Sequence, residues 1–406
     1  MSLQTAGSAG WLALLCANRV ATALMFMTYA ATLPTLVDAW GMTGAQAGSI
    51  AGALNVTFGA SVVASSWLAD RVGARRMLLV FAWLAAASAL ALAIFARSYP
   101  TGLAFVAVMG LTQGGSYGPA MMLIADHVPA NRRGMAMGWL LAAASLGYAG
   151  SLAVSAIAMG VADYQLAFLG TAVGPVAGAC IATFVLRRTP NVVTRPAAPP
   201  TRRPSRRRRW PAALLTAGYS GHAWELLGMW AWMPAFLVFA TASPNAGAAV
   251  GGGLLIAIAL HLSGVVASAT MGTASDRIGR RRVLIALGAA GAGCSFAAGW
   301  TIGAPVGVLV VFVLIYGFAA LGDSAVLSTA MTEAVAPGRL GSALAIRSLL
   351  GFGAGAVAPV AFGAVLGDPD PGGHGSWGLA FAVLGIGGLV ATVSALLLPS
   401  GEPGQS

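Results

Sequence analysis

Four ionisable side chains interrupt long apolar stretches of this 406-residue sequence, and they are the first candidates for chemistry. Arg19, Glu225, Asp323 and Arg347 each stand among residues that are almost entirely apolar. An arginine or aspartate at the centre of a membrane helix costs about 2.5–3.5 kcal/mol on insertion scales, so such residues usually bind a ligand, an ion or one another. We therefore predict that these four residues belong to a site inside the protein.

Two interpretations of these charges are open. In the functional one they bind substrate and protons, and His222, one helical turn before Glu225, shares the proton of that carboxylate. In the structural one they form ion pairs, Arg19 with Glu225 or Arg347 with Asp323. The two overlap, because a pair that breaks when substrate or proton binds also couples the two events. We favour the functional interpretation, because intramembrane ionisable residues usually mark pathways.

The elements that must position these residues are membrane-spanning helices. The hydrophobic fraction is 58% and only 8% of residues are charged, whereas a soluble domain has about 25% charged residues. Continuous apolar runs recur from end to end, and in lipid only helices and closed barrels satisfy their own backbone groups. We predict twelve helical spans, at 11–36, 45–68, 77–96, 101–125, 135–158, 164–186, 212–240, 249–271, 283–303, 305–330, 341–366 and 377–398.

The basic residues are distributed unevenly between the two sides of these spans. All 22 are arginine; one side holds three at 71–76, two at 132–133, nine at 187–209, four at 277–282 and Arg339, whereas Arg97 alone lies on the other. The positive-inside rule places the arginine-rich side, with both termini, in the cytoplasm, and we expect a multi-pass protein of the cytoplasmic (inner) membrane. The net charge of +11 is therefore a topology signal and does not indicate nucleic-acid binding.

Two loops recur at a nearly constant offset. Residues 70–76 read Asp-Arg-Val-Gly-Ala-Arg-Arg, and 276–282 read Asp-Arg-Ile-Gly-Arg-Arg-Arg, 206 residues later. The loop 126–134 is matched in the same way by 333–341, 207 residues later. Repetition in the same order indicates the duplication of a six-helix unit. We divide the chain into an N-terminal six-helix bundle at 1–186, a cytoplasmic Arg/Pro-rich linker at 187–210 and a C-terminal six-helix bundle at 211–406.

The Asp-Arg-x-Gly-x-Arg-Arg loop resembles the signature loop of the major facilitator superfamily, and its repeat, the 6+6 spans and the basic linker fit the same family. The resemblance covers essentially the whole chain. It implies an all-α membrane protein with twelve transmembrane helices in two pseudo-symmetric six-helix halves. One departure is that Ser66 stands where the family usually opens the motif with glycine, while the second copy keeps Gly272.

In that family the signature loop latches the two halves together on the cytoplasmic side when the central cavity opens outward. The resemblance gives this gating role to the matching positions of both copies. They are Asp70, Gly73, Arg75 and Arg76 in the first copy, and Asp276 and Gly279 in the second.

The resemblance also implies a central cavity lined by spans one, four, seven and ten. Arg19 and Glu225 are 206 residues apart, so we expect them at equivalent depth in opposite halves. Side chains at helical 3-4 spacing are expected to share the cavity with these charges. They are Thr22, Phe26, Tyr29 and Leu33 in span one, Gln113 and Tyr117 in span four, and His222, Met229, Trp232 and Phe236 in span seven.

These features predict a secondary active transporter that moves a small solute by alternating access. Our leading hypothesis is a proton-coupled transporter of a small organic anion: Arg19 binds a carboxylate bidentately, and Glu225 or Asp323 takes up the proton. Proton-antiport efflux of drugs or metabolites is one alternative, and a membrane sensor built on a transporter fold is another. No nucleophile–base pair, metal-ligand set or nucleotide-binding loop occurs, so we predict no enzyme activity, cofactor or metal. The expected partners are substrate, protons and anionic lipid headgroups, for a functional monomer.

Overall fold

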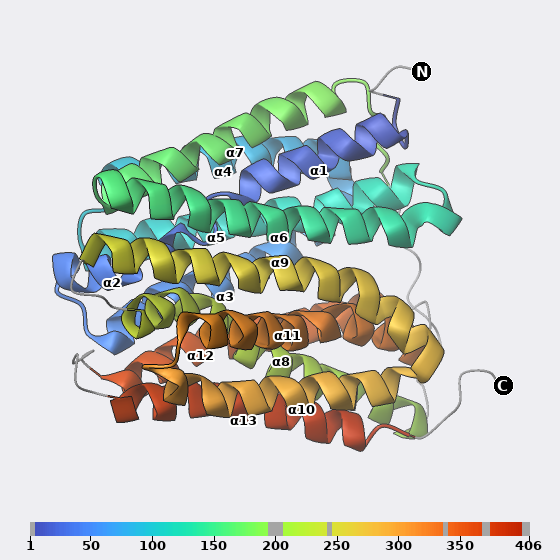
Figure 1. The fold of residues 1–406 in the computed structure, drawn as a ribbon. Helices are drawn as coiled ribbons and strands as arrows, with labels where there is room; N and C mark the ends of the chain where they lie inside the picture. Colours follow the sequence, from blue (N-terminus) through green and yellow to red (C-terminus); the bar gives the residue numbers. More distant parts are fainter. Residues whose placement is uncertain (1–4, 194–205, 242–245, 336–339, 368–373, 400–406) are drawn as a thin grey trace.

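The structure, a computed structural model, describes residues 5–193, 206–241, 246–335, 340–367 and 374–399, and every regular element in them is helical (Figure 1). Residues 194–205 of the linker, and Arg339, lie outside these ranges. The helices are α1 (Ala9–Ala23), α2 (Thr28–Trp40), α3 (Gly44–Val72), α4 (Ala74–Phe95), α5 (Tyr99–His127), α6 (Ala130–Val161), α7 (Tyr164–Leu186), α8 (Arg206–Ala240), α9 (Ala246–Ile278), α10 (Arg280–Ala298), α11 (Val306–Ala334), α12 (Leu340–Leu366) and α13 (His374–Leu396), with a 3-10 turn η1 (Gly299–Thr301) after α10.

These helices supply the expected membrane spans. Eleven candidates among the described residues are long and apolar enough to cross a bilayer, with α1 and α2 together forming the first. The remaining helix, α5, has 29 residues but a polar middle, Thr112–Gln113 followed by two glycines and Ser116. The prediction of an all-α membrane protein is therefore confirmed. Among the predicted spans, α5 is the one that is not apolar enough to be a candidate by composition alone.

The first predicted span, 11–36, is not one helix. Between α1 and α2 the amides of Leu24, Phe26 and Thr28 bond to carbonyls three residues earlier, at 3.2, 3.0 and 3.4 Å. These tight turns interrupt the i to i−4 ladder of the α-helix. Beyond the break, the Thr28 hydroxyl lies 2.9 Å from Thr171 Oγ1 of α7, which fixes the start of α2.

The predicted duplication is visible in how the helices pack within each half. A Cβ atom added to Gly110 of α5 would lie 2.6 Å from the Leu54 carbonyl oxygen of α3. A Cβ added to Gly317 of α11 would lie 2.6 Å from the Leu260 carbonyl oxygen of α9. The same close helix approach, made possible by glycine, thus recurs 206–207 residues later.

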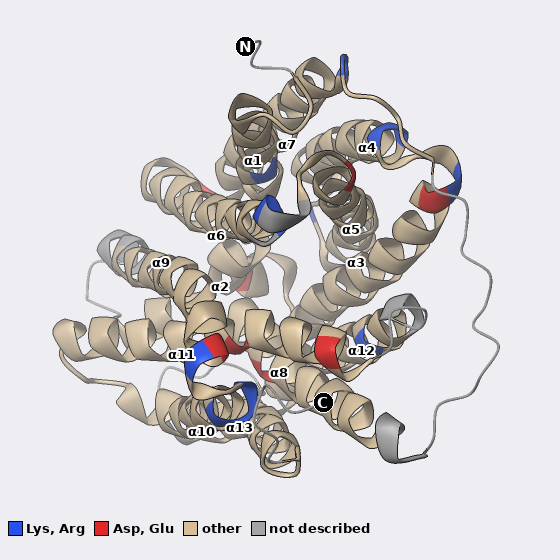
Figure 2. Ribbon diagram, turned by 90° about the vertical axis from the view of Figure 1, so that its right-hand side faces the viewer, with Lys and Arg blue, Asp and Glu red and all other residues tan. Residues whose placement is uncertain are grey.

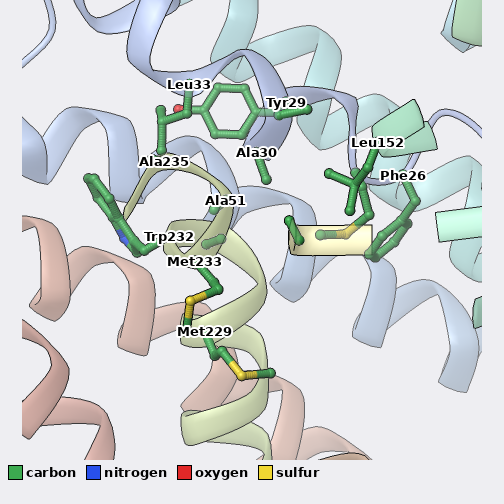
Figure 3. Close-up of a cluster of buried hydrophobic side chains, with 14 of the residues drawn as sticks. Phe26, Tyr29, Ala30, Leu33, Ala51, Leu152, Met229, Trp232, Met233 and Ala235 are labelled. Carbon is green, nitrogen blue, oxygen red and sulfur yellow. The ribbon is translucent and has the colours of Figure 1, made fainter. Parts of the chain in front are cut away.

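The two halves meet along α3 with α12 and along α6 with α9. The two halves pack closely at the end of the bundle away from the chain termini, where a Cβ on Gly44 would lie 2.3 Å from the Gly363 carbonyl oxygen and one on Gly48 would lie 2.1 Å from that of Pro359. Tyr29 of α2 belongs to the same buried apolar cluster as α8 residues there (Figure 3). The helices of the two halves diverge toward the end that holds both termini (Figure 1).

We call the end that holds the loops 71–76 and 277–282 the arginine-rich end, and the other the opposite end. Figure 2 views the molecule from the arginine-rich end, where the basic residues gather around the helix termini. The two six-helix groups are therefore joined at the opposite end and spread apart at the arginine-rich end.

Candidate functional site

Arg19 is buried in α1 with 6% of its surface exposed. Its guanidinium carbon lies 5.3 Å from the centroid of the Tyr117 ring of α5, and Tyr148 of α6 lies beside it. Within the described residues its Nε has no hydrogen-bond partner and no carboxylate lies within ion-pair distance. A cation held by aromatic faces, with donors left over, can bind an anionic group.

Arg347 of α12 is held in a similar way in the other half. Its guanidinium carbon lies 4.2 Å from the centroid of Tyr219 of α8, and Nη1 donates to Ser328 Oγ of α11 at 3.2 Å. Its Nε also has no partner among the residues that the structure describes. Phe58 of α3 lies 6.4 Å from Tyr117 and 5.5 Å from Phe352 of α12, between ring centroids. Two guanidinium groups from opposite halves therefore face one aromatic region.

Asp323 of α11 pairs with His222 of α8. The distance from His222 Nδ1 to Asp323 Oδ1 is 2.8 Å, which meets the distance of an ion pair although the angle is not that of a hydrogen bond. The other ring nitrogen, Nε2, lies 2.8 Å from Ser324 Oγ. The pair of Asp323 with Arg347, which the structural interpretation of the charges offered, does not form in the described part of the chain. A buried histidine–carboxylate pair can take up and release a proton.

Glu225 points into the C-terminal half. Ser295 Oγ of α10 donates to its Oε1 at 2.7 Å, and Ser295 Oγ lies 2.5 Å from the Tyr316 hydroxyl of α11. A Cβ added to Gly388 of α13 would lie 2.8 Å from Glu225 Oε2. This carboxylate is therefore enclosed by its own half, and the pair of Arg19 with Glu225 that the structural interpretation offered is not formed among the described residues.

The expected equivalence of Arg19 and Glu225 is not seen in the contacts with the last helix of each half. A Cβ added to Gly178 of α7 would lie 3.4 Å from the Asn18 carbonyl oxygen and 3.3 Å from the Thr22 nitrogen. A Cβ added to Gly387 of α13 would lie 2.5 Å from the Gly221 carbonyl oxygen and 3.2 Å from the Glu225 nitrogen. By these contacts Glu225 takes the place of Thr22 and not that of Arg19.

Two aromatic residues of the expected lining face of α8 lie in the core instead. Trp232 stacks on Phe362 of α12, with ring centroids 5.0 Å apart. Phe236 packs edge-on against Phe381 of α13, also at 5.0 Å. Both side chains are buried, so these two residues pack against other aromatic rings.

The side of α8 that faces the other half carries an aromatic residue, Trp230, that was not among the predicted site residues. Trp230 lies 6.4 Å from Phe26 and 5.2 Å from Tyr148, both in the N-terminal half. Tyr148 also lies 5.6 Å from His261 of α9. The spacing of Tyr219, His222, Leu226 and Trp230 on one helical face was the available signal.

Gln113 completes the N-terminal part of the site. It lies one helical turn before Tyr117 on α5, so both are on the same face. Only 1% of its surface is exposed, and its Nε2 has no partner among the described residues. A buried amide donor without a partner is costly, which is consistent with a place in a ligand site.

The two signature loops share one construction. Gly73 and Gly279 both have left-handed φ, at +90° and +94°. Arg75 Nε donates to the Leu186 carbonyl at the end of α7 at 2.7 Å, and Arg281 Nη2 donates to the Leu396 carbonyl at the end of α13 at 2.8 Å. Each loop is thereby clamped to the last helix of its own half.

The surroundings of the two loops differ. In the first, Asn191 of the linker donates to the Val72 carbonyl at 2.9 Å and accepts from the Arg76 amide at 3.4 Å. In the second, Arg280 pairs with both Asp276 and Glu333. These contacts lie within each half and the start of the linker, so the latch role given to Asp70, Gly73, Arg75, Arg76, Asp276 and Gly279 stays a prediction.

Comparison with known proteins identifies relatives. A family model for the Major Facilitator Superfamily matches residues 15–267. A probable 4-methylmuconolactone transporter of Cupriavidus pinatubonensis is 26% identical over 265 residues, 63% of this chain and 60% of the relative, which is less than two thirds of its length. A probable sulfoacetate transporter of Cupriavidus necator is 26% identical over 406 residues, covering 92% of this chain and 90% of the relative.

Solved structures share the fold. A nucleoside transporter, NupG, superposes with a TM-score of 0.72 at 14% identity, covering 94% of this chain and 99% of the other. A bacterial homologue of the human lysosomal transporter Spinster, in an inward-facing and unoccupied conformation, gives a TM-score of 0.69 at 16% identity and covers 96% of each chain. At such identities the likeness concerns the fold alone.

Proposed function

The chain belongs to the major facilitator superfamily and is a multi-pass membrane transporter, and on that premise we propose that it carries a small organic anion together with protons. The observation that supports this most directly is Arg19, buried against Tyr117 with no carboxylate partner in the described residues. A guanidinium group in that setting binds carboxylates and sulfonates through paired hydrogen bonds. The names of both curated relatives, which refer to organic acids, agree with an anionic substrate.

The arginine-rich end, in this proposal, faces the cytoplasm together with both termini, as the positive-inside rule requires. The halves at 1–186 and 211–406 then rock about their contacts, with the linker 187–210 joining them. The close packing of the halves at the opposite end and their divergence at the arginine-rich end (Figure 1) support a state of this cycle that opens toward the cytoplasm.

Asp323 and His222 form the proposed proton site. The charged and titratable groups around Asp323 are His222, Tyr219 and Glu225 of α8 and Arg347 of α12. In this proposal a proton on Asp323 removes a negative charge from the C-terminal side of the site, where Arg347 stands, so anion affinity is expected to rise as pH falls. Proton uptake and anion binding thereby favour each other, which is the reciprocity required of coupled transport.

A ligand screen tests the proposal first. Purified detergent-solubilised protein is heated with small carboxylates, sulfonates and lipophilic cations at acidic and alkaline pH. A ligand present at about 100 times its dissociation constant stabilises the fold by about 2.7 kcal/mol. Stabilisation by anions, stronger at acidic pH, is expected; stabilisation by lipophilic cations alone would replace the proposal with drug or metabolite efflux.

Arg19→Lys is the decisive variant. It keeps the charge but loses the planar pair of donors, so we expect anion affinity to fall by roughly 1.5–3 kcal/mol, about 10- to 150-fold. Transport of the stabilising anion into proteoliposomes provides the measurement. Arg97→Lys, in a loop at the opposite end, is the matched control and should transport normally. Full activity of Arg19→Lys would remove this residue from the substrate site.

A further inference from the structure

We propose that the substrate is a dianion, with one acidic group bound by Arg19 and the other by Arg347. This inference rests on the proposed function, because it specifies which anions the same site accepts. Its starting point is that two guanidinium groups, one from each half, are stacked on tyrosines and each keep an Nε without a partner in the described residues.

The two arginines lie at comparable depth. Arg19 is ten residues from the start of α1 at Ala9, and Arg347 is seven residues from the start of α12 at Leu340, both counted from the arginine-rich end. At 1.5 Å per residue these are about 15 Å and about 10 Å along the helices. The ring of Phe58 connects the two helices, since it lies 6.4 Å from Tyr117 and 5.5 Å from Phe352 of α12. A ligand that lies along these rings is placed to meet both groups.

The charges around the site leave room for two negative groups. Asp323 is paired with His222, and Glu225 is enclosed by Ser295 and the glycines of α10 and α13. Neither carboxylate forms an ion pair with Arg19 or Arg347 in the part of the chain that the structure describes. A monoanion would leave one buried guanidinium uncompensated, whereas a dianion neutralises both.

A ligand bound at both ends also connects the halves. Arg19 and Arg347 belong to opposite six-helix groups, and they repel each other when the arginine-rich end closes without a ligand between them. A dianion replaces this repulsion with two attractions. It therefore favours closure of the arginine-rich end, and a monoanion of the same length does so less.

The experiment compares acids that differ in one charge. Binding to the purified full-length protein is measured by thermal stabilisation with succinate against succinamate, and with sulfoacetate against sulfoacetamide, since each second compound replaces one acidic group with a neutral amide. We expect each dianion to bind at least about tenfold more tightly than its amide, a difference of about 1.4 kcal/mol. Arg19→Gln and Arg347→Gln should each abolish this preference, whereas Arg97→Gln should keep it.

The outcomes separate the inference from the proposed function. If diacid and amide bind equally well, and binding depends on Arg19 alone, the dianion inference is overturned and anion transport stands. If Arg347→Gln keeps the preference for diacids, the inference is likewise overturned. If none of these four compounds, nor any other carboxylate or sulfonate, stabilises the wild type, both fall. Arg347→Lys, together with the melting temperature of each variant without ligand, separates a lost contact from a failure to fold.

Discussion

In the N-terminal half a Cβ added to Gly178 of α7 would lie against the Asn18 carbonyl oxygen and the Thr22 nitrogen, and in the C-terminal half one added to Gly387 of α13 would lie against the Gly221 carbonyl oxygen and the Glu225 nitrogen. The backbone contact is of the same kind, but the neutral Thr22 of one half stands in the place of a buried acid in the other. The glycine contacts between neighbouring helices are likewise repeated. Duplication thus kept the close helix contacts, and the two halves differ chiefly in the charges placed on them.

The signature loops repeat this lesson at the arginine-rich end. Both turn at a glycine with left-handed φ, and both clamp the last helix of their half through an arginine. However, Ala74 stands in the first loop where the second has Arg280, which pairs with Asp276 and Glu333. The first loop is instead covered by Asn191 of the linker. Asn191 of the linker therefore holds the first loop in place, whereas an ion-pair network holds the second.

The largest effect on transport is expected from neutralising Asp323, one of the two buried carboxylates of the C-terminal half; neutralising Glu225, the other, is the comparison. Asp323→Asn should abolish both uphill anion accumulation and the pH dependence of anion binding, because the proposed proton site of Asp323 and His222 is lost. Glu225→Gln should keep both, because its amide oxygen can still accept from Ser295. Transport and binding at acidic and alkaline pH provide the measurement. Equal losses in the two variants would assign proton coupling to Glu225 as well.

Alanine in place of the two loop glycines should give the next largest effect. Each substitution forces a residue with a Cβ into the left-handed region, at a cost of about 1–3 kcal/mol in unfolding free energy. Gly73→Ala should cost more than Gly279→Ala, because the new Cβ would lie 2.2 Å from Asn191 Oδ1, whereas nothing lies within 4 Å of the one at Gly279. Thermal unfolding of both variants checks the order. Asn191→Ala should bring the two values together.

Removing the ion-pair network of the second loop should have the smallest effect. Asp276 and Glu333 are largely exposed, and such pairs contribute about 0.2–1 kcal/mol. Arg280→Ala should therefore lower the melting temperature only slightly, and less so at high salt, where the wild-type pairs are screened. The exposed Arg282 serves as the control position. A large, salt-independent loss for Arg280→Ala would indicate a role in packing.

The sequence predicted the helices well and their rotation poorly. Apolar runs, loop arginines and the repeated motif fixed the spans and the fold, because these follow from what lipid allows. Periodicity also grouped the residues of α8 into faces, but it does not state which face meets which neighbour. The loops repeat at offsets of 206 and 207 residues, but a constant spacing between loops does not state which residues of the preceding helices occupy equivalent places, and Glu225 takes the place of Thr22 and not that of Arg19.

Other parts of the site depended on contacts between distant segments. Tyr148 and Trp230 are ordinary aromatic residues in their own helices, and only the meeting of the two halves brings them to 5.2 Å. The pairing of Asp323 with His222, rather than with Arg347, depends on the rotation of three helices at once. Arg19 was found early because a buried charge in an apolar run is costly wherever it points.

The break at Leu24–Met27 divides the first membrane span into two mechanically separate pieces. Arg19 stands on the piece nearer the arginine-rich end, while Tyr29, whose hydroxyl bonds to the Ala47 carbonyl of α3 at 2.8 Å, stands on the other. A continuous helix would transmit any tilt of one end to the other, whereas a joint halfway across the bilayer lets one piece pivot while its neighbour stays seated. The piece that carries Arg19 can therefore tilt while the piece that carries Tyr29 stays packed against α3, so the rigid unit in this span is half a helix and not a whole one.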